Sequence, residues 1–349
     1  MRVLIAPDSF GDTLTAAEAA DAIAAGWSSA RDDELILAPQ SDGGPGFVDA
    51  LAADGGEVIE STVSGPLGDV VTARWLLDGA TAYVEVAQTV GLGLLGRSPD
   101  PESAVAASSR GVGQIVAEAL TRGATTVVVG LGGSSSTDGG AGMIEALGGP
   151  DAAVAALADV DLVAATDVDN PLLGPAGAAA VFGPQKGADA DTVRVLEERN
   201  ADWCVELDRV AERAVADLPG AGAAGGLGAA LLALGATRTS GADLVAERTR
   251  RHEVMPTVDV VLTGEGKFDS QSLRGKVVTA LAGSAREHGV RTVVLAGQVR
   301  LGEDDMRAAG IESAHSVTDF AGSVDLAMSD ARAQLTGLAA DVARTGSWA

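Results

Sequence analysis

Residues 127–142, with the sequence VVVGLGGSSSTDGGAG, carry the pattern of a buried strand that turns into a helix. Three valines followed by glycine indicate a short strand of a parallel sheet. The loop after such a strand lies at the carboxyl edge of the sheet, where open α/β folds bind ligands. Because glycine-rich patterns are weak evidence, two interpretations stay open. The loop binds phosphate through its backbone and hydroxyl groups, with Asp138 as a Mg²⁺ ligand or base, or it is a tight turn in which Asp138 caps the next helix.

The two ends of the chain share this strand-and-helix pattern. Short apolar strands, most of them followed by helices, are expected at residues 2–6, 34–38, 259–263, 292–296 and 313–318. Such elements predict a mostly parallel, three-layer α/β domain built from both chain ends. Residues 57–86 alternate instead between apolar and polar side chains, with Gly-Pro and Asp-Gly turns, which predicts an antiparallel meander.

We therefore expect two α/β domains. A discontinuous, Rossmann-like domain comprises residues 1–56 and 256–349, and a second domain with a mixed sheet and glycine-rich loops, residues 57–255, is inserted into it. Within the insertion, residues 190–217 read as a charged amphipathic helix, most simply a solvated face.

Polar side chains follow several of the predicted strands. Asp8 and Asp42 follow the first two, so they are candidates to meet in one cleft, although both can equally be helix caps. The segment 166–171, TDVDNP, offers two aspartates and an asparagine for Mg²⁺ or a hydroxyl group. The acidic, glycine-rich loop 264–276 carries two lysines and is the second phosphate-site candidate.

Composition excludes several kinds of partner and compartment. The formal charge of −25 opposes binding to nucleic acid or to an anionic membrane surface. The single cysteine, Cys204, allows no intramolecular disulfide and reads as a buried helix residue, which suits a reducing cytoplasm. The first residues lack the long apolar run of a signal peptide, so we expect a cytoplasmic protein.

Lysine is scarce in this chain. Of 24 basic residues, three are lysines, namely Lys186, Lys267 and Lys276. Because arginine serves wherever else a cation is needed, a retained lysine suggests a position where a compact ammonium group matters.

Taken together, the loops resemble the glycerate kinase family. The resemblance rests on motifs such as IAPDSF, SDGG, SSRGVGQ, FGPQKGA and PGAGAAGG, which occur in order along nearly the whole chain. The matching segments are residues 5–10, 41–46, 108–114, 130–134, 138–143, 167–172, 182–188, 219–226, 264–267 and 269–276.

The resemblance implies ATP- and Mg²⁺-dependent phosphorylation of D-glycerate to 2- or 3-phosphoglycerate, in a cleft between two α/β domains. Asp42 or Asp8 is assigned as the base, Asp167 and Asp169 as Mg²⁺ ligands, and loop 131–140 as the phosphate cradle, with Lys186 and Lys276 countering its charge. The other expected substrate- or phosphate-binding residues are Ser9, Gly43, Gly44, Arg110, Gly132, Gly133, Ser134, Asp138, Asn170, Glu265, Asp269 and Arg274. The expected partners are D-glycerate and ATP, and the oligomeric state stays open, with a homodimer as one option.

The chain departs from the family pattern in three places. Gly11 stands where the family usually has lysine, and Pro45 stands where it has glutamate. The region between residues 147 and 163 is also shorter than usual. The lost lysine and glutamate could have formed an ion pair, whose joint loss leaves no unpaired charge. Alternatively the lysine could have bound the substrate carboxylate, so that its loss changes the substrate.

Three functions follow from these alternatives. The first is a glycerate kinase. The second is a kinase for another small hydroxy acid or polyol, which a substrate screen would reveal. The third is a non-catalytic homologue that binds a ligand, which a failure of ATP to raise the melting temperature would favour.

Overall fold

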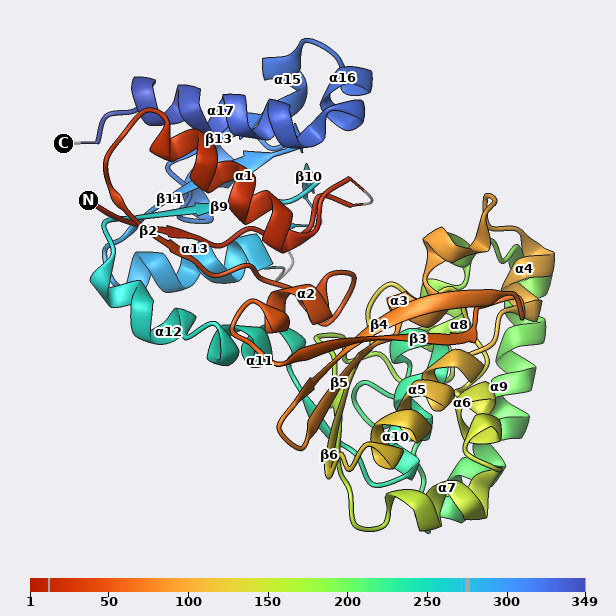
Figure 1. The fold of residues 1–349 in the computed structure, drawn as a ribbon. Coiled ribbons are helices and arrows are strands. Elements are labelled where there is room, and N and C mark those ends of the chain that lie inside the picture. Colours follow the sequence, from red (N-terminus) through yellow and green to blue (C-terminus); the bar gives the residue numbers. More distant parts are fainter. Residues whose placement is uncertain (12, 271, 274–276, 349) are drawn as a thin grey trace. The chain divides into compact units, whose positions relative to one another are not determined.

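The structure of the chain is a computed structural model that describes residues 1–11, 13–270, 272–273 and 277–348. It confirms a two-part α/β architecture with a five-stranded parallel sheet, a six-stranded mixed sheet and a small two-stranded parallel sheet (Figure 1). Unit 1 comprises Met1–Asp42, Asp49–Asp54 and Val245–Ala349, and unit 2 comprises Gly43–Val48 and Gly55–Leu244. The domain boundaries expected at residues 56/57 and 255/256 stay a prediction.

Unit 1 is built on a five-stranded parallel sheet with the strand order β13-β11-β9-β1-β2. Its strands are β1 (Arg2–Ile5), β2 (Glu34–Leu37), β9 (Val260–Thr263), β11 (Arg291–Ala296) and β13 (Ser313–Ser316). All five were predicted from short apolar runs at the two chain ends. Because all strands are parallel, the loops after β1, β2 and β9 meet at one edge of the sheet.

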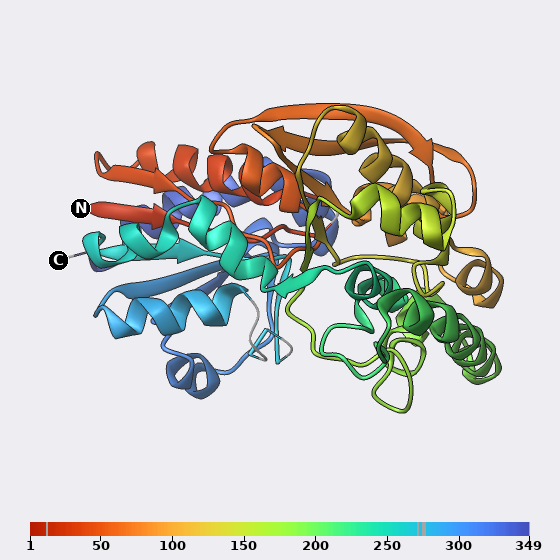
Figure 2. The ribbon, with the colours of Figure 1, turned by 90° about the horizontal axis from the view of Figure 1, so that it is seen from below.

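Helices cover both faces of this sheet (Figure 2). Val3 and Ile5 of β1 point into one core with α1 (Ala16–Ser28) and α17 (Ala331–Thr345). Leu4, between them, packs on the opposite face with α13 (Val277–Glu287). The period-two alternation of a strand thus divides its side chains between two helical layers.

The start of α1 is a capping box formed by Thr15 and Glu18. The Thr15 hydroxyl accepts a hydrogen bond from Glu18 N, and the Glu18 carboxylate accepts one from Thr15 N at 2.9 Å. The other elements of unit 1 are α12 (Arg251–Val254), η4 (Met255–Thr257), β10 (Lys267–Phe268), β12 (Gln298–Val299), α14 (Glu303–Ala308), α15 (Val317–Ala321) and α16 (Val324–Ser329).

Unit 2 contains a six-stranded mixed sheet with the order β3-β4-β5-β6-β7-β8. Its strands are β3 (Glu57–Ser64), β4 (Val70–Asp78), β5 (Thr81–Glu85), β6 (Thr126–Gly130), β7 (Asp161–Ala165) and β8 (Thr237–Thr239). The antiparallel meander of β3, β4 and β5 is confirmed. Because β5 also pairs in parallel with β6, the meander continues into the parallel half of the same sheet.

One core of unit 2 joins this sheet to its helices, with Trp75, Val127, Val129, Ile115 and Leu207 among its buried side chains. The helices of unit 2 are α3 (Ala87–Val90), η1 (Leu92–Leu95), α4 (Pro101–Ala106), α5 (Arg110–Thr121), α6 (Ala141–Ala146), α7 (Pro150–Leu157), α8 (Ala178–Phe182), η2 (Pro184–Lys186), α9 (Ala190–Ala211), η3 (Ala223–Gly226) and α10 (Leu227–Ala233). Two helices, α2 (Phe47–Ala52) and α11 (Gly241–Arg248), contain residues of both units.

Two expectations for individual elements were wrong. The strand expected at 313–318 ends at Ser316, because the Ser316 hydroxyl accepts a hydrogen bond from Asp319 N and begins α15. The helix expected at 190–217 ends at residue 211, and it is more than a solvated face, because Leu196, Asn200, Cys204 and Leu207 are buried. Within the described residues, no helix has the length and apolar character needed to cross a membrane.

A glycine in α1 sets how closely two helices of unit 1 pack. A Cβ atom at Gly26 would collide with the Thr336 carbonyl oxygen of α17 and lie 2.9 Å from Ala339 Cβ. We expect Gly26→Ala to lower the free energy of unfolding by about 1–3 kcal/mol, measured by urea denaturation, because the helices cannot separate without loss of packing.

Gly283→Ala is the matched control. Gly283 also lies inside a helix, α13, but a Cβ atom there would have no neighbour within 4 Å. This substitution should stabilise the protein by about 0.5–1 kcal/mol, because alanine favours the helix. Equal effects at both positions would contradict the packing explanation.

Candidate active site

The carboxyl edge of the unit 1 sheet carries three acidic side chains on neighbouring loops. Asp8 follows β1, Asp42 follows β2 and Glu265 follows β9. The loops are joined through their backbones, since Asp8 N donates to Gly264 O at 2.8 Å and Gly266 N donates to Ser9 O at 3.3 Å. Asp8 and Asp42 are half-buried, and Glu265 is buried. The structure thus brings the two candidate bases to one edge, as the strand order requires.

Gln40, which the sequence did not single out, ties the loops of Asp8 and Asp42 together. Its backbone N–H donates to Pro7 O at 2.9 Å. Its side-chain oxygen accepts a hydrogen bond of 2.7 Å from Arg251 Nη1, and its side-chain nitrogen donates to Ala38 O at 2.7 Å. Both Gln40 and Arg251 are buried. A polar residue directly after an apolar strand was the only available signal for it.

The loop after β9 holds several further candidates. Lys267 Nζ lies 2.9 Å from the Asp269 carboxylate, and Asp269 N donates to Ser272 Oγ at 3.2 Å. The Lys267 side chain in this ion pair is exposed, whereas the Asp269 side chain is mostly buried. The expected substrate-binding residue Arg274 and the expected catalytic residue Lys276 lie outside the described residues.

In unit 2, two glycine-rich loops pack backbone against backbone. Gly132 N donates to Gly43 O at 3.0 Å. A Cβ atom at Gly132 would collide with the backbone of Gly44, and one at Gly133 would come within 2.8 Å of the Pro45 ring. Close loop packing therefore explains these glycines whether or not a ligand approaches them. Gly133 is exposed and Gly132 half-buried, so this corner remains accessible to a phosphate.

The hydroxyl groups that follow these glycines point into the unit. The side chains of residues 134–137 are all buried. Ser135 Oγ donates to Val90 O at 2.8 Å, and Lys186 Nζ donates to Ser134 Oγ at 2.9 Å and to Ser136 O at 2.6 Å. Lys186 thus supports the loop from inside, and its action on a phosphate stays a prediction. Burial lowers the pKa of Lys186 from 10.5 to about 7, although the nearby Asp138 charge opposes this effect.

Asp138 connects the starts of two helices. Its Oδ2 accepts hydrogen bonds from Ser109 N at 2.7 Å and Ser109 Oγ at 2.8 Å, just before α5. The same carboxylate accepts from Gly140 N and Gly142 N, both at 3.2 Å, at the start of α6. Four donors therefore surround this buried carboxylate, which favours the capping interpretation of Asp138.

The acidic loop after β7 offers two exposed carboxylates, of which Asp169 is held in an ion pair. Asp167 is exposed, and its Oδ2 accepts a hydrogen bond from Ala242 N at 3.1 Å. Asp169 forms an ion pair with Arg238 at 2.7 Å, and Asn170 Nδ2 donates to Ala176 O at 2.8 Å. In the part of the chain that the structure describes, no three His, Cys, Asp or Glu side chains gather closely enough to hold a metal ion by themselves.

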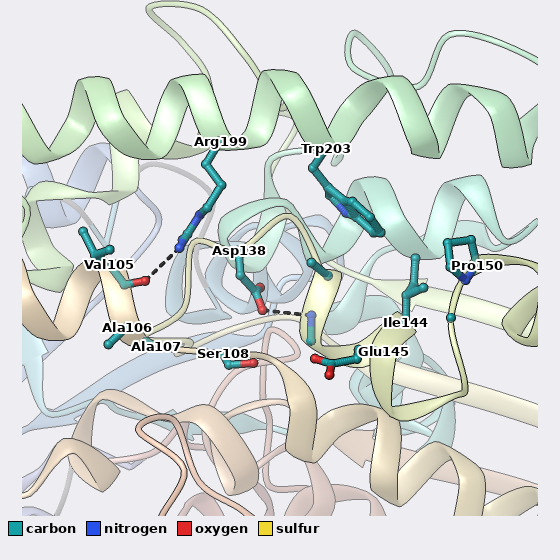
Figure 3. A pocket seen from close by; sticks show the side chains of 13 residues that line it. Val105, Ala106, Ala107, Ser108, Asp138, Ile144, Glu145, Pro150, Arg199 and Trp203 are labelled. Carbon is teal, nitrogen blue, oxygen red and sulfur yellow. Dashed lines mark hydrogen bonds between the residues drawn. The ribbon is translucent and has the colours of Figure 1, made fainter.

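A pocket of about 520 Å³ opens in unit 2 beside α9 (Figure 3). Arg199 and Trp203 of α9 form one wall, residues 105–108 lie opposite, and Asp138 lies between them. The expected substrate-binding residue Arg110 lies next to the pocket, where its guanidinium is 3.2 Å from Glu145. Sequence reasoning missed Arg199 and Trp203, although their spacing of four residues on a predicted helix places them on one face.

Comparison with known proteins identifies the class of enzyme. The sequence pattern of the glycerate kinase family matches residues 3–153 and 150–347. A glycerate kinase from Bacillus subtilis is 37% identical over 98% of this chain and 97% of its own length. A glycerate 2-kinase from Escherichia coli is 36% identical over 99% and 98%. A crystal structure assigned as a glycerate kinase 2 from Salmonella typhimurium has a TM-score of 0.77, with 32% identity over 99% and 98%.

The chain is therefore a kinase, a phosphotransferase that acts on an alcohol acceptor. It belongs to the glycerate kinase family. This confirms the resemblance that the loop motifs carried.

The buried Lys186 makes stability depend on pH. The unfolded chain binds a proton on this lysine up to a pH of about 10.5, whereas the folded protein releases it near 7. Between these values the unfolded state binds more protons, so stability rises with pH, by up to about 1.4 kcal/mol per unit for one proton. Below pH 7 both states are protonated and this contribution is constant.

We expect Lys186→Met to remove that rise in urea denaturation experiments at pH 7, 8 and 9. Lys267→Met serves as the control, because the Lys267 side chain is 60% exposed. A rise that persists unchanged in Lys186→Met would show that another group titrates.

Proposed function

We propose that this chain transfers the γ-phosphoryl group of ATP to a hydroxyl group of D-glycerate, giving 2- or 3-phosphoglycerate. The observation that carries the proposal is the placement of two half-buried aspartates, Asp8 and Asp42, in the loops that follow the neighbouring parallel strands β1 and β2. Relatives named glycerate kinase that match nearly the whole chain support D-glycerate as the acceptor.

The chain's own residues can supply positioning and proton transfer. Asp8 or Asp42 accepts the proton of the attacking hydroxyl group, as a carboxylate at the active site can. Ser9 N donates to Asp8 Oδ1 at 2.7 Å, which leaves Asp8 oriented by its own loop. The exposed backbone at Gly133 would lie against the phosphates, while the Gly132 N–H is already bonded to Gly43 O and Lys186 keeps the loop in place from within.

Magnesium fits the acidic loop after β7. In kinases Mg²⁺ is typically held by one or two carboxylates together with substrate phosphates and water, so a complete protein cage is not required. Asp167 and Asp169, which are both exposed, would hold it, with Asp169 also paired through Oδ1 with Arg238. When bound, Mg²⁺ neutralises negative charge on the phosphates.

The test is a coupled assay with ATP, Mg²⁺ and D-glycerate. Enolase and pyruvate kinase detect 2-phosphoglycerate directly, while 3-phosphoglycerate is detected only after phosphoglycerate mutase is added. We expect turnover, and we expect Asp8→Asn or Asp42→Asn to lower kcat by about 10²-fold or more, because one of them removes the base.

Asp21→Asn, in the middle of α1, is the matched control and should retain wild-type turnover. Absence of turnover with D-glycerate, while ATP still raises the melting temperature, would overturn the proposed acceptor. Wild-type kcat in both aspartate variants would overturn the proposed base.

Gly11 favours a second candidate, a kinase for another small hydroxy acid or polyol. A lysine side chain would have room there, since a Cβ atom would meet no neighbour within 4 Å. Its φ of +58° would nevertheless cost a lysine about 1 kcal/mol. Without that lysine the chain lacks one natural partner for a substrate carboxylate.

Substituting Gly11 separates the two candidates. If D-glycerate is the substrate of this chain, Gly11→Lys should change its KM by less than about threefold. A large fall in KM would show that the lost lysine binds the carboxylate and that another substrate is preferred. Stability that is recovered only when Pro45→Glu is added to Gly11→Lys would indicate the lost ion pair instead.

A further inference from the structure

The pocket beside α9 contains a cation that no carboxylate neutralises at close range. Arg199 donates from Nη1 to Val105 O and from Nη2 to Thr137 O, both at 2.7 Å. Its Nε is buried without a hydrogen-bond partner, and no ion pair forms at this guanidinium among the described residues. Burial lowers the pKa of Arg199, and the more distant Asp138 charge opposes that effect. The guanidinium plane is therefore fixed at the wall of a cavity.

Trp203 provides a second fixed plane, one helical turn along α9. Its indole N–H donates to Gly139 O at 3.0 Å, which holds the half-buried ring in one orientation. Figure 3 shows the two side chains extending from the same face of α9 toward the loop that carries Asp138. A tryptophan ring and a guanidinium plane are the groups on which aromatic bases stack.

The other residues that line the pocket disfavour binding of a phosphate group. The charged side chains of the pocket are Asp138, Glu145 and Arg199, two carboxylates against one cation. Most other lining residues, including Ile144 and Pro150, are apolar. A polyanion would be repelled by this lining, whereas a neutral planar ligand gains both stacking and apolar burial. The volume of about 520 Å³ is within the range of small-molecule pockets and accommodates a nucleoside.

We propose that this pocket binds the adenine base of the phosphoryl donor. The inference rests on the proposed function in one respect, that the donor is an adenine nucleotide. The proposal places the adenine base in unit 2, against α9, the helix that was expected from the sequence to be exposed to solvent. The phosphates of the nucleotide then lie outside the pocket, away from the carboxylates of Asp138 and Glu145.

The test measures ADP binding by isothermal titration calorimetry, which requires no turnover. Trp203→Leu removes the stacking surface and Arg199→Met removes the guanidinium, and each should raise the Kd for ADP by about tenfold or more. Trp203→Phe retains a planar ring and should recover most of the affinity. The KM for ATP should rise in parallel, while the KM for D-glycerate stays at its wild-type value.

Arg194→Met is the matched control, because Arg194 lies on the same helix with 72% of its side chain exposed. It should leave the Kd unchanged. Wild-type affinity for ADP in folded Arg199→Met and Trp203→Leu proteins would overturn the pocket assignment.

Photolabelling of the wild-type protein keeps the proposal testable even if the variants fail to fold. A photoreactive 8-azidoadenosine nucleotide should label peptides that contain residues 105–108, 141–150 or 199–203. Labelling confined to other peptides would overturn the proposal. Lack of turnover with D-glycerate, together with ADP binding that the variants abolish, would overturn the proposed acceptor alone.

Discussion

Backbone contact between glycine-rich loops determines the shape of the edge of unit 2 where we propose that phosphate binds. Gly132 lies against Gly44 so closely that neither alanine nor any larger residue fits, and Gly225 packs in the same way against the backbone at Ser136. Loops held backbone to backbone have few alternative conformations. Such an edge is preorganised, because little ordering is left to occur when a phosphate arrives.

A buried basic side chain supports a loop in each unit. Lys186 donates to the hydroxyl-rich loop, and Arg251 donates to Gln40 beside Asp42. In a chain with a net charge of −25, Arg251 places positive charge behind the loops of unit 1, whereas burial lowers the pKa of Lys186 to about 7, so that its charge depends on pH. Burying a charge is costly. That cost is offset here by hydrogen bonds to oxygens of the loops that the cations position.

Patterns of burial could be predicted from the sequence, but the directions of individual side chains could not. Strands β1, β9 and β11 of unit 1 were evident because a strand buried on both faces is a short, continuous apolar run. The three-residue β8 and the short helices α4 and α7 carry too few residues for such a pattern. The candidate loops do follow strands, as predicted, while their part in a site stays a prediction. The Ser135 hydroxyl donates to Val90 O rather than pointing toward a ligand. That contact joins residues far apart in the sequence, so local sequence patterns do not predict it.

The loop that carries Pro45 is held in place by contacts that do not need a charged side chain at position 45. Glu85, buried at the end of β5, accepts hydrogen bonds from Gly46 N at 3.2 Å and Val48 N at 3.1 Å. The first N–H groups of α2 are therefore capped by Glu85 at the end of β5. Residue 45 does not need to supply an acceptor for them. Proline has no N–H to satisfy, and its ring fills the space beside Gly133. With proline at position 45, the loop is held by the Glu85 carboxylate and by the packing of the proline ring beside Gly133.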